Sequence, residues 1–313
     1  MWRVVIPVWF LGCQSEYEVV VAPVSVHPGE VAPCDFTQVG DTDFWAYDCN
    51  PVFTTTGEDW APTVGATAFA VTEVMGHPFY QLWYTGVPND ADRGEYGLGY
   101  AVSSEGTDWS VHAANPMLTE PAAPNAWDAS NMDQMQVVWD PETSQYVMVY
   151  QGYNIEGGDW GLGVAVSDDG STWSRSEANP VFDLGDGIGA ISGWCWPLGL
   201  TLSDEGSGYT GYIAGAQTAI TTEDVRCEVY RLKAPDADHW VPDTSRVLAA
   251  GPSGSWDDQG IGSLAIATLD DTQYMFYQGF GSWIEADSYV MSNEHFFGMA
   301  IMENGGWTKQ EGP

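Results

Sequence analysis

Acidic side chains are the commonest groups in this chain that could do chemistry. Its 313 residues include 44 Asp and Glu against 8 Lys and Arg, a formal charge of −36. Asp90, Asp92 and Glu95 place carboxylates close together around Gly94, and hard oxygen donors of this kind favour calcium. The twelfth-position acid of an EF-hand is missing, because Ala101 stands there. A calcium site at these acids is one interpretation, and a solvated acidic loop is the other.

Several other kinds of reactive site are excluded by their missing motifs. The five His form neither His-x-x-x-His nor His-Glu-x-x-His, and no paired-Cys motif is present, so a zinc centre is unsupported. The sequence also lacks a Gly-rich phosphate loop and a Gly-x-Ser-x-Gly elbow. No cofactor is required, and calcium is the one candidate. The negative charge would repel nucleic acid, and it disfavours an anionic membrane surface unless a lipid anchors the chain.

The N-terminus reads as a processing signal. Met1-Trp2-Arg3 is followed by an apolar stretch over residues 4–11 and then by Cys13. This pattern resembles a bacterial lipoprotein signal, with residues 1–12 removed, Cys13 lipidated and residues 13–34 acting as a tether. The stretch is too short to span a bilayer. The residues after Cys13 favour the outer membrane or cell surface, and the alternative is an ordinary export signal or a misassigned start.

The cysteine count agrees with export. Five Cys is an odd number, and lipidation of Cys13 leaves four. We expect two disulfides, one between Cys34 and Cys49 and one between Cys195 and Cys227, as is common in an oxidising compartment.

The chain is organised as a repeat of about 65 residues. Asn-Pro followed by an apolar residue recurs at Asn50, Asn115 and Asn179, which are 65 and 64 residues apart. A Tyr-x-Gly motif and a Ser-x-x-Gly-x-x-Trp motif recur with a similar spacing, as Tyr84, Tyr150 and Tyr277 and as Trp109 and Trp173. Self-similarity at a fixed period predicts one structural unit per repeat.

Each repeat reads as four short strands. In the second repeat these cover residues 134–139, 145–151, 161–167 and 172–176, separated by turn residues. The Ser-x-x-Gly-x-x-Trp segment predicts a hairpin in which Gly takes a positive φ. Four-stranded antiparallel units at this period predict an all-β propeller. We expect one domain over residues 35–313 with five blades, residues 35–50 belonging to the fifth. Four blades is the alternative.

These motifs together resemble the five-bladed propellers of the glycoside hydrolase family 43 and 32 superfamily. The similarity is carried in the second repeat by Tyr150-Gln151-Gly152, by Gly163-Val164-Ala165-Val166-Ser167, by Trp173 and by Asn179-Pro180-Val181. It covers about residues 45–310 and is specific for architecture. It implies a funnel at the propeller axis, where innermost strands present carboxylates that act as general acid and as nucleophile or base.

The resemblance directs attention to acids at the start of each first strand. Asp133, followed by Gln134, is the best match, and Asp59 and Asp258 are the nearest acids in the first and fourth repeats. The expected triad is not intact, because Trp196 stands where the family would place an acid in the third repeat. With so many acids in the chain, a solvated or turn-stabilising Asp is the alternative for each.

Aromatic residues form the second cue, because sugar rings stack on indole faces. The candidates for binding a glycan, beside Gln134, are Trp60, Trp127, Trp194 and Trp196. A Trp that recurs once per repeat is more simply explained by packing between blades, whereas Trp194 and Trp196 break the repeat. The Asp residues beside Trp, namely Asp59, Asp128 and Asp257, are expected to cap turns.

The sequence therefore predicts an exported, monomeric propeller that handles carbohydrate. The first hypothesis is a glycoside hydrolase-like protein that acts on a neutral or cationic extracellular polysaccharide through axial carboxylates. The second is a non-catalytic propeller lipoprotein that binds a glycan or another envelope protein.

Overall fold

The computed structural model describes a series of segments that together cover most of the chain after residue 58. They are residues 36–38, 45–47, 49, 51–54, 58–87, 96–119, 126–154, 159–183, 193–202, 207–216, 226–269, 272–281, 283–286, 289–292 and 295–310. The signal at residues 1–12, Cys13, the tether over residues 13–34 and the acids Asp90, Asp92 and Glu95 lie outside them. Those expectations stay predictions.

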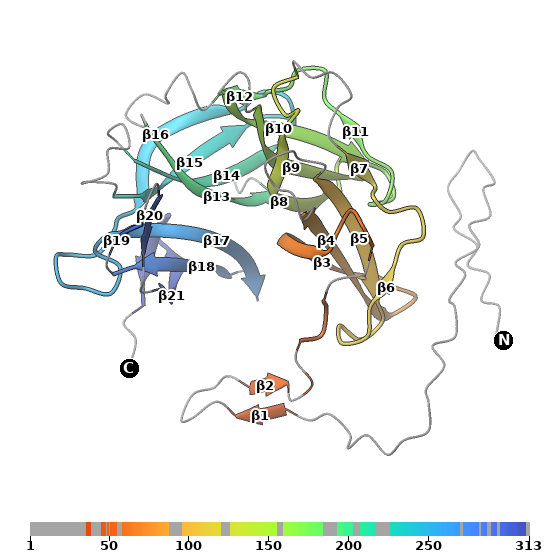
Figure 1. The fold of residues 1–313 in the computed structure, drawn as a ribbon, viewed down its shortest axis with the longest axis horizontal. Coiled ribbons are helices and arrows are strands. Elements are labelled where there is room, and N and C mark those ends of the chain that lie inside the picture. The colour runs from red at the N-terminus through yellow and green to blue at the C-terminus, as the bar shows by residue number, and fades with distance from the viewer. Residues whose placement is uncertain are drawn as a thin grey trace.

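The described residues form strands and turns throughout, and none of their elements is a helix long and apolar enough to cross a membrane. They contain four antiparallel sheets that surround a common centre (Figure 1). The prediction of an all-β propeller is confirmed, with the four blades that the sequence left open as the alternative.

Each blade begins with its innermost strand and proceeds outward along the chain. Blade 1 contains β3 (Thr63–Val74), β4 (His77–Val87), β5 (Gly97–Ser103), β6 (Ser110–Val111) and β7 (Leu118–Thr119). Blade 2 contains β8 (Asn131–Asp140), β9 (Gln145–Asn154), β10 (Asp159–Ser167), β11 (Ser174–Arg175) and β12 (Phe182–Asp183). The four strands predicted in the second repeat are thus present.

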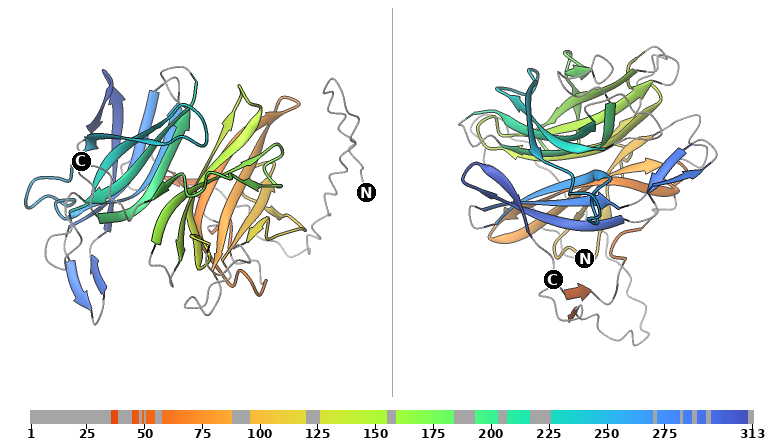
Figure 2. Two further views of the ribbon diagram at one scale, coloured as in Figure 1. Left: turned by 90° about the horizontal axis from the view of Figure 1, so that it is seen from above. Right: turned by 90° about the vertical axis from the view of Figure 1, so that its left-hand side faces the viewer.

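The other two blades have the same four-strand order. Blade 3 contains β13 (Gly193–Leu202), β14 (Tyr209–Ala216), β15 (Glu228–Ala234) and β16 (Val241–Leu248). Blade 4 contains β17 (Gly260–Leu269), β18 (Thr272–Phe280), β21 (His295–Glu303) and β22 (Gly306–Lys309), with the hairpin of β19 (Trp283–Ala286) and β20 (Tyr289–Ser292) inserted. A separate hairpin, β1 (Phe36–Gln38) with β2 (Trp45–Tyr47), precedes the blades. Figure 2 shows the sheets standing side by side, with β19 and β20 projecting from blade 4.

The Ser-x-x-Gly-x-x-Trp hairpins form as predicted. Gly106 and Gly170 have φ of 81° and 77°, the left-handed region that glycine adopts without a Cβ penalty. The Oγ of Ser167 accepts the backbone N–H of Gly170 at 2.8 Å, and Trp173 donates its indole N–H back to the Gly170 carbonyl at 3.1 Å. Each hairpin is therefore held by contacts within seven residues, which is why the sequence alone predicts it.

Large side chains fill the space between successive blades. Trp83 and Tyr100 of blade 1 pack with Met148 and Trp173 of blade 2 in one buried cluster. Similar clusters join blade 2 to blade 3 and blade 3 to blade 4. Trp83 also donates its indole N–H to the carbonyl of Gly170 at 2.7 Å, so one hairpin of blade 2 contacts the core of blade 1.

Candidate functional site

All four innermost strands carry an irregularity at the same level. In β3, β8 and β17 one extra residue bulges out between Val64 and Thr67, between Asp133 and Gln136, and between Ile261 and Leu264. In β13 two extra residues do so between Trp194 and Leu198. Bulges of this kind re-aim side chains and are frequent beside active sites. Since β3 packs on β8, β8 on β13 and β13 on β17, the four bulges surround the axis at one end of the propeller.

Asp133 lies at the edge of the bulge in β8. Its Oδ2 accepts a long hydrogen bond of 3.4 Å from the side-chain amide of Gln134, whose backbone has φ of 51°. Its Oδ1 is buried and has no hydrogen-bond partner in the part of the chain that the structure describes. A buried carboxylate oxygen without a partner is costly. Asp133 is therefore placed to interact with something that reaches the axis.

The equivalent positions in the other blades hold no carboxylate. Each of them follows the residue that pairs with the Gly of the second-strand motif, namely Gly86, Gly152, Gly215 and Gly279. The residues there are Gly65, Asp133, Cys195 and Gly262. Within this ring of positions Asp133 is the single acid, so a symmetric set of axial carboxylates is not present at this level.

The other two candidate acids lie in the turns before their strands. Asp59 is exposed in the turn that precedes β3. Asp258 accepts the backbone N–H of Gly254 at 2.6 Å and the side-chain amide of Gln259 at 2.9 Å, and these hydrogen bonds hold the pKa of its carboxyl below the usual range. Both acids lie at the same end of the propeller as Asp133, because each blade starts with its innermost strand, but neither occupies the bulge.

Trp60 and Trp127 pack against their own blades. Trp60 stacks on Tyr84 at 5.9 Å, and Trp127 stacks on Tyr150 at 5.7 Å. Each indole also covers glycines of the second and third strands, where an added Cβ on Gly152 would lie 2.3 Å from Trp127. Both side chains stay half-buried, and their contribution to a ligand site remains a prediction.

Trp194 and Trp196 fall at the two-residue bulge of β13. Their backbone belongs to the innermost strand of blade 3, at the level of Asp133, while their side chains lie outside the described residues. The disulfide pairings Cys34 with Cys49 and Cys195 with Cys227 also stay predictions, because the side chains of Cys34 and Cys195 lie outside as well. Among the described residues no cluster of His, Cys, Asp and Glu could hold a metal ion.

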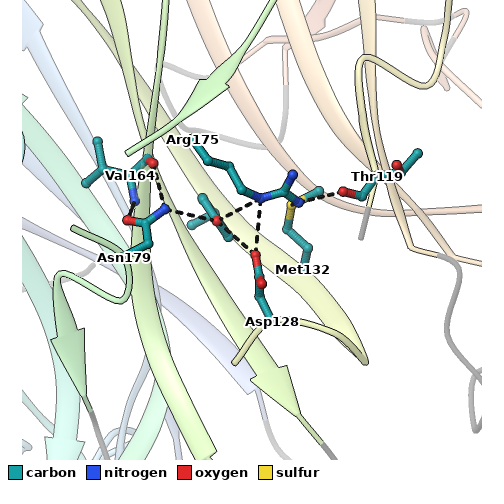
Figure 3. A network of polar contacts seen from close by, with 7 residues as sticks. Thr119, Asp128, Met132, Val164, Arg175 and Asn179 are labelled. Carbon is teal, nitrogen blue, oxygen red and sulfur yellow. Dashed lines mark hydrogen bonds and ion pairs between the residues drawn. The ribbon is translucent and has the colours of Figure 1, made fainter. Parts of the chain in front are cut away.

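Sequence reasoning missed a polar network that replaces the expected turn caps. Asp128 accepts hydrogen bonds from the hydroxyl of Tyr150 at 3.0 Å and from the Nε of Arg175 at 3.2 Å (Figure 3). Arg175 also reaches the carbonyl of Thr119 in blade 1, so the network joins two blades. Burial raises the pKa of the Tyr150 hydroxyl, and the Asp128 charge raises it further.

Blade 4 repeats this network with a lysine. The Oδ2 of Asp257 contacts the ammonium of Lys309, which lies 5.4 Å above the ring of Tyr277. Blade 1 has neither partner, because Ala61 and Val111 occupy the corresponding positions. The signal that could have found the network is this joint change of an acid and a cation, about 50 residues apart.

Searches against known proteins give matches in structure alone. No protein-family model matches the chain, and no curated protein matches it. A glycosyl hydrolase from Bacteroides ovatus superposes with a TM-score of 0.57 at 16% identity, over 84% of this chain and 78% of that one. A thermostable family-43 glycoside hydrolase gives 0.54 at 17%, over 83% and 76%. The GH32 β-fructofuranosidase of Bombyx mori gives 0.53 at 15%, over 81% and 50%. The chain thus shares its fold with glycoside hydrolase propellers, as the sequence motifs predicted.

Proposed function

We propose that this chain is a carbohydrate-active propeller that hydrolyses a neutral or cationic extracellular polysaccharide at the bulged end of its innermost strands, with Asp133 as one catalytic carboxylate. The observation that carries the proposal is the buried, unpartnered Oδ1 of Asp133 on the axial face of β8. The shared fold with glycoside hydrolase propellers supports the substrate class. The charge of −36 argues against strongly anionic glycans.

Hydrolysis of a glycosidic bond needs a second carboxylate about 5–10 Å from the first. Asp59 and Asp258 lie in turns at the same end of the propeller as Asp133, and they are the two acids proposed for this part. Trp194 and Trp196, which interrupt the repeat in β13, are proposed to stack on the sugar. Gln134, beside the acid, is proposed to donate to a sugar hydroxyl.

The alternative is a propeller that binds a glycan without cleaving it. The presence of Gly65, Cys195 and Gly262 where Asp133 has its equivalents favours this function, because binding needs one oriented polar group rather than a catalytic pair. In both versions the chain is proposed to be exported as a monomer and anchored through a lipid on Cys13. Incorporation of labelled palmitate that Cys13→Ser abolishes would support the anchor.

A glycan-release screen separates these functions. The chain starting after Cys13 is incubated with plant, algal and microbial polysaccharides, with and without calcium, and sugar release is measured. Asp133→Asn should lower release at least 100-fold, since it removes the reacting carboxylate. Asp108→Asn is the matched control, because Asp108 is exposed in a hairpin of blade 1.

Each outcome of the screen decides something. Release that survives Asp133→Asn excludes Asp133 from catalysis. Retention on one polysaccharide in an affinity gel, without release and weakened by Asp133→Asn, supports the binding function. Stimulation by calcium that is lost on changing Asp90 and Asp92 to Asn would support the calcium site.

A further inference from the structure

The ring of four blades is open on one side. Blades 1 and 2, 2 and 3, and 3 and 4 are neighbours through their innermost strands, and Figure 1 shows an open side between blade 4 and blade 1. The hairpin of β1 and β2 lies on this side, away from the four sheets. The two sheet faces that border the opening therefore show whether another layer belongs there.

The face of blade 4 toward the opening is apolar. Phe276 is 38% exposed, although the residues at its position in the other blades, Trp83, Val149 and Tyr212, are almost wholly buried against the next blade. Phe297, which pairs in register with the residue two after Phe276, is 82% exposed. Blade 4 thus exposes the kind of surface that each other blade buries.

The face of blade 1 toward the opening has the same character. Phe69 and Val71 of β3 are each 52% exposed. The corresponding residue to Phe69 in blade 2, Val137, packs against the core that joins blade 2 to blade 1. Exposed apolar patches this large, facing one another, mark an interaction surface.

The chain itself begins to cover this surface. Phe53 lies 5.0 Å from the ring of Tyr84 and 6.3 Å from Trp109, on the same face of blade 1 as Phe69. The residues before it contain apolar and aromatic runs, at 17–21, 36–39 and 44–47. The segment that ends at Phe53 is therefore joined directly to the open face.

We infer that residues 14–57 pack as a further sheet between blade 4 and blade 1 and cover Phe276, Phe297, Phe69 and Val71. Closing the ring removes the two apolar faces from water, which stabilises the whole domain at about 25 cal/mol per Å² of apolar area buried. The inserted sheet also becomes a wall of the axial site. The inference does not depend on the proposed carbohydrate chemistry.

Hydrogen exchange of the full chain, followed by mass spectrometry, tests this packing. Amides of residues 17–47 should be protected in the wild type, because a docked strand exchanges through opening of its contacts. Phe276→Ser and Phe69→Ser should each raise exchange in that segment at least tenfold. Val241→Ser is the control, because Val241 is 58% exposed on β16, away from the opening.

The controls make the result decisive. Amides of β9 should stay protected in every variant, which shows that the blades remain folded. Exchange of residues 17–47 at the rate of a free peptide in the wild type would overturn the inference. Protection that disappears on dilution, together with a dimer in light scattering, would overturn it as well, because a second copy would then be the occupant.

Discussion

The carboxylate of Asp128 and the guanidinium of Arg175 form an ion pair at 3.2 Å between residues that are 47 positions apart in the chain. Asp128 is buried, and the Arg175 side chain is 26% exposed. The pair has a counterpart in Asp257 and Lys309 of blade 4 and is replaced by Ala61 and Val111 in blade 1. An acid and its cation are thus present together or absent together in blades of one chain.

This relationship predicts a strong coupling between the two residues. Asp128→Ala or Arg175→Val alone should lower the free energy of unfolding by about 2 kcal/mol, because each strands a buried charged partner that is partly reached by solvent. The double variant, which copies blade 1, should cost about 1–2 kcal/mol less than the sum of the two. Urea unfolding of the four proteins measures this coupling, and strict additivity would contradict it.

A second prediction concerns the contact between blades 2 and 3. The hydroxyl of Tyr209 donates to Asp140 at 2.6 Å. Burial raises the pKa of Asp140, but this hydrogen bond and one from the backbone N–H of Glu142 outweigh burial, so the pKa lies below its usual range. Tyr209→Phe should cost about 2 kcal/mol at pH 7, since the acceptor is charged.

The cost of Tyr209→Phe should depend on pH. A carboxyl whose pKa is lowered by folding contributes its full stability above the unfolded pKa of about 3.9, and loses it as pH falls through the folded value. The difference between wild type and variant should therefore be constant from pH 7 to 5 and shrink below about pH 4. Urea unfolding across this range measures it. A cost that stays constant below pH 4, or an equal effect of Tyr80→Phe, would refute the assignment.

A third prediction separates backbone strain from packing. Gly170 and Gly305 both adopt the left-handed region, with φ of 77° and 78°. A Cβ at Gly170 would lie 3.1 Å from Trp83 of the next blade, whereas at Gly305 nothing lies within 4 Å. Gly305→Ala should cost about 1 kcal/mol for conformation, and Gly170→Ala about 1–3 kcal/mol more for overpacking. Equal losses in thermal unfolding would show that the contact between blades adds nothing.

A fourth prediction follows from the charge of −36. Raising the salt concentration from 0.01 M to 1 M shortens the Debye length from about 30 Å to about 3 Å, which screens repulsion among the acids. The melting temperature should rise with NaCl and reach a plateau. If calcium binds at a built site, CaCl2 at matched ionic strength should raise it further, and chelation should reverse that extra gain. A melting temperature independent of salt would contradict the role of self-repulsion.

Much of the fold was predictable because its signals are local. The hairpins of Gly106 and Gly170 depend on a hydroxyl, a glycine and an indole within seven residues, so their spacing in the sequence was sufficient. The repeat period predicted the blades for the same reason, because each blade is one continuous stretch of chain.

The role of Asp128 and Asp257 was not predictable in this way. Beside a Trp and near a turn, both were expected to cap turns, and that expectation was wrong. Their cations, Arg175 and Lys309, come from the outermost strand of the same blade. Only the packing of first strand against last brings such charges together.

The sequence by itself determined the class of fold and the blade pattern, since these follow from spacings of Gly, Trp and Asn-Pro that each blade satisfies internally. The tertiary structure decided which acid reaches the axis. One bulge in β8 sets Asp133 beside Gln134 and leaves its Oδ1 buried without a partner, while Asp59 and Asp258 stay in turns. Strand register is a pairing between distant segments, and a shift of one residue turns a side chain to the opposite face.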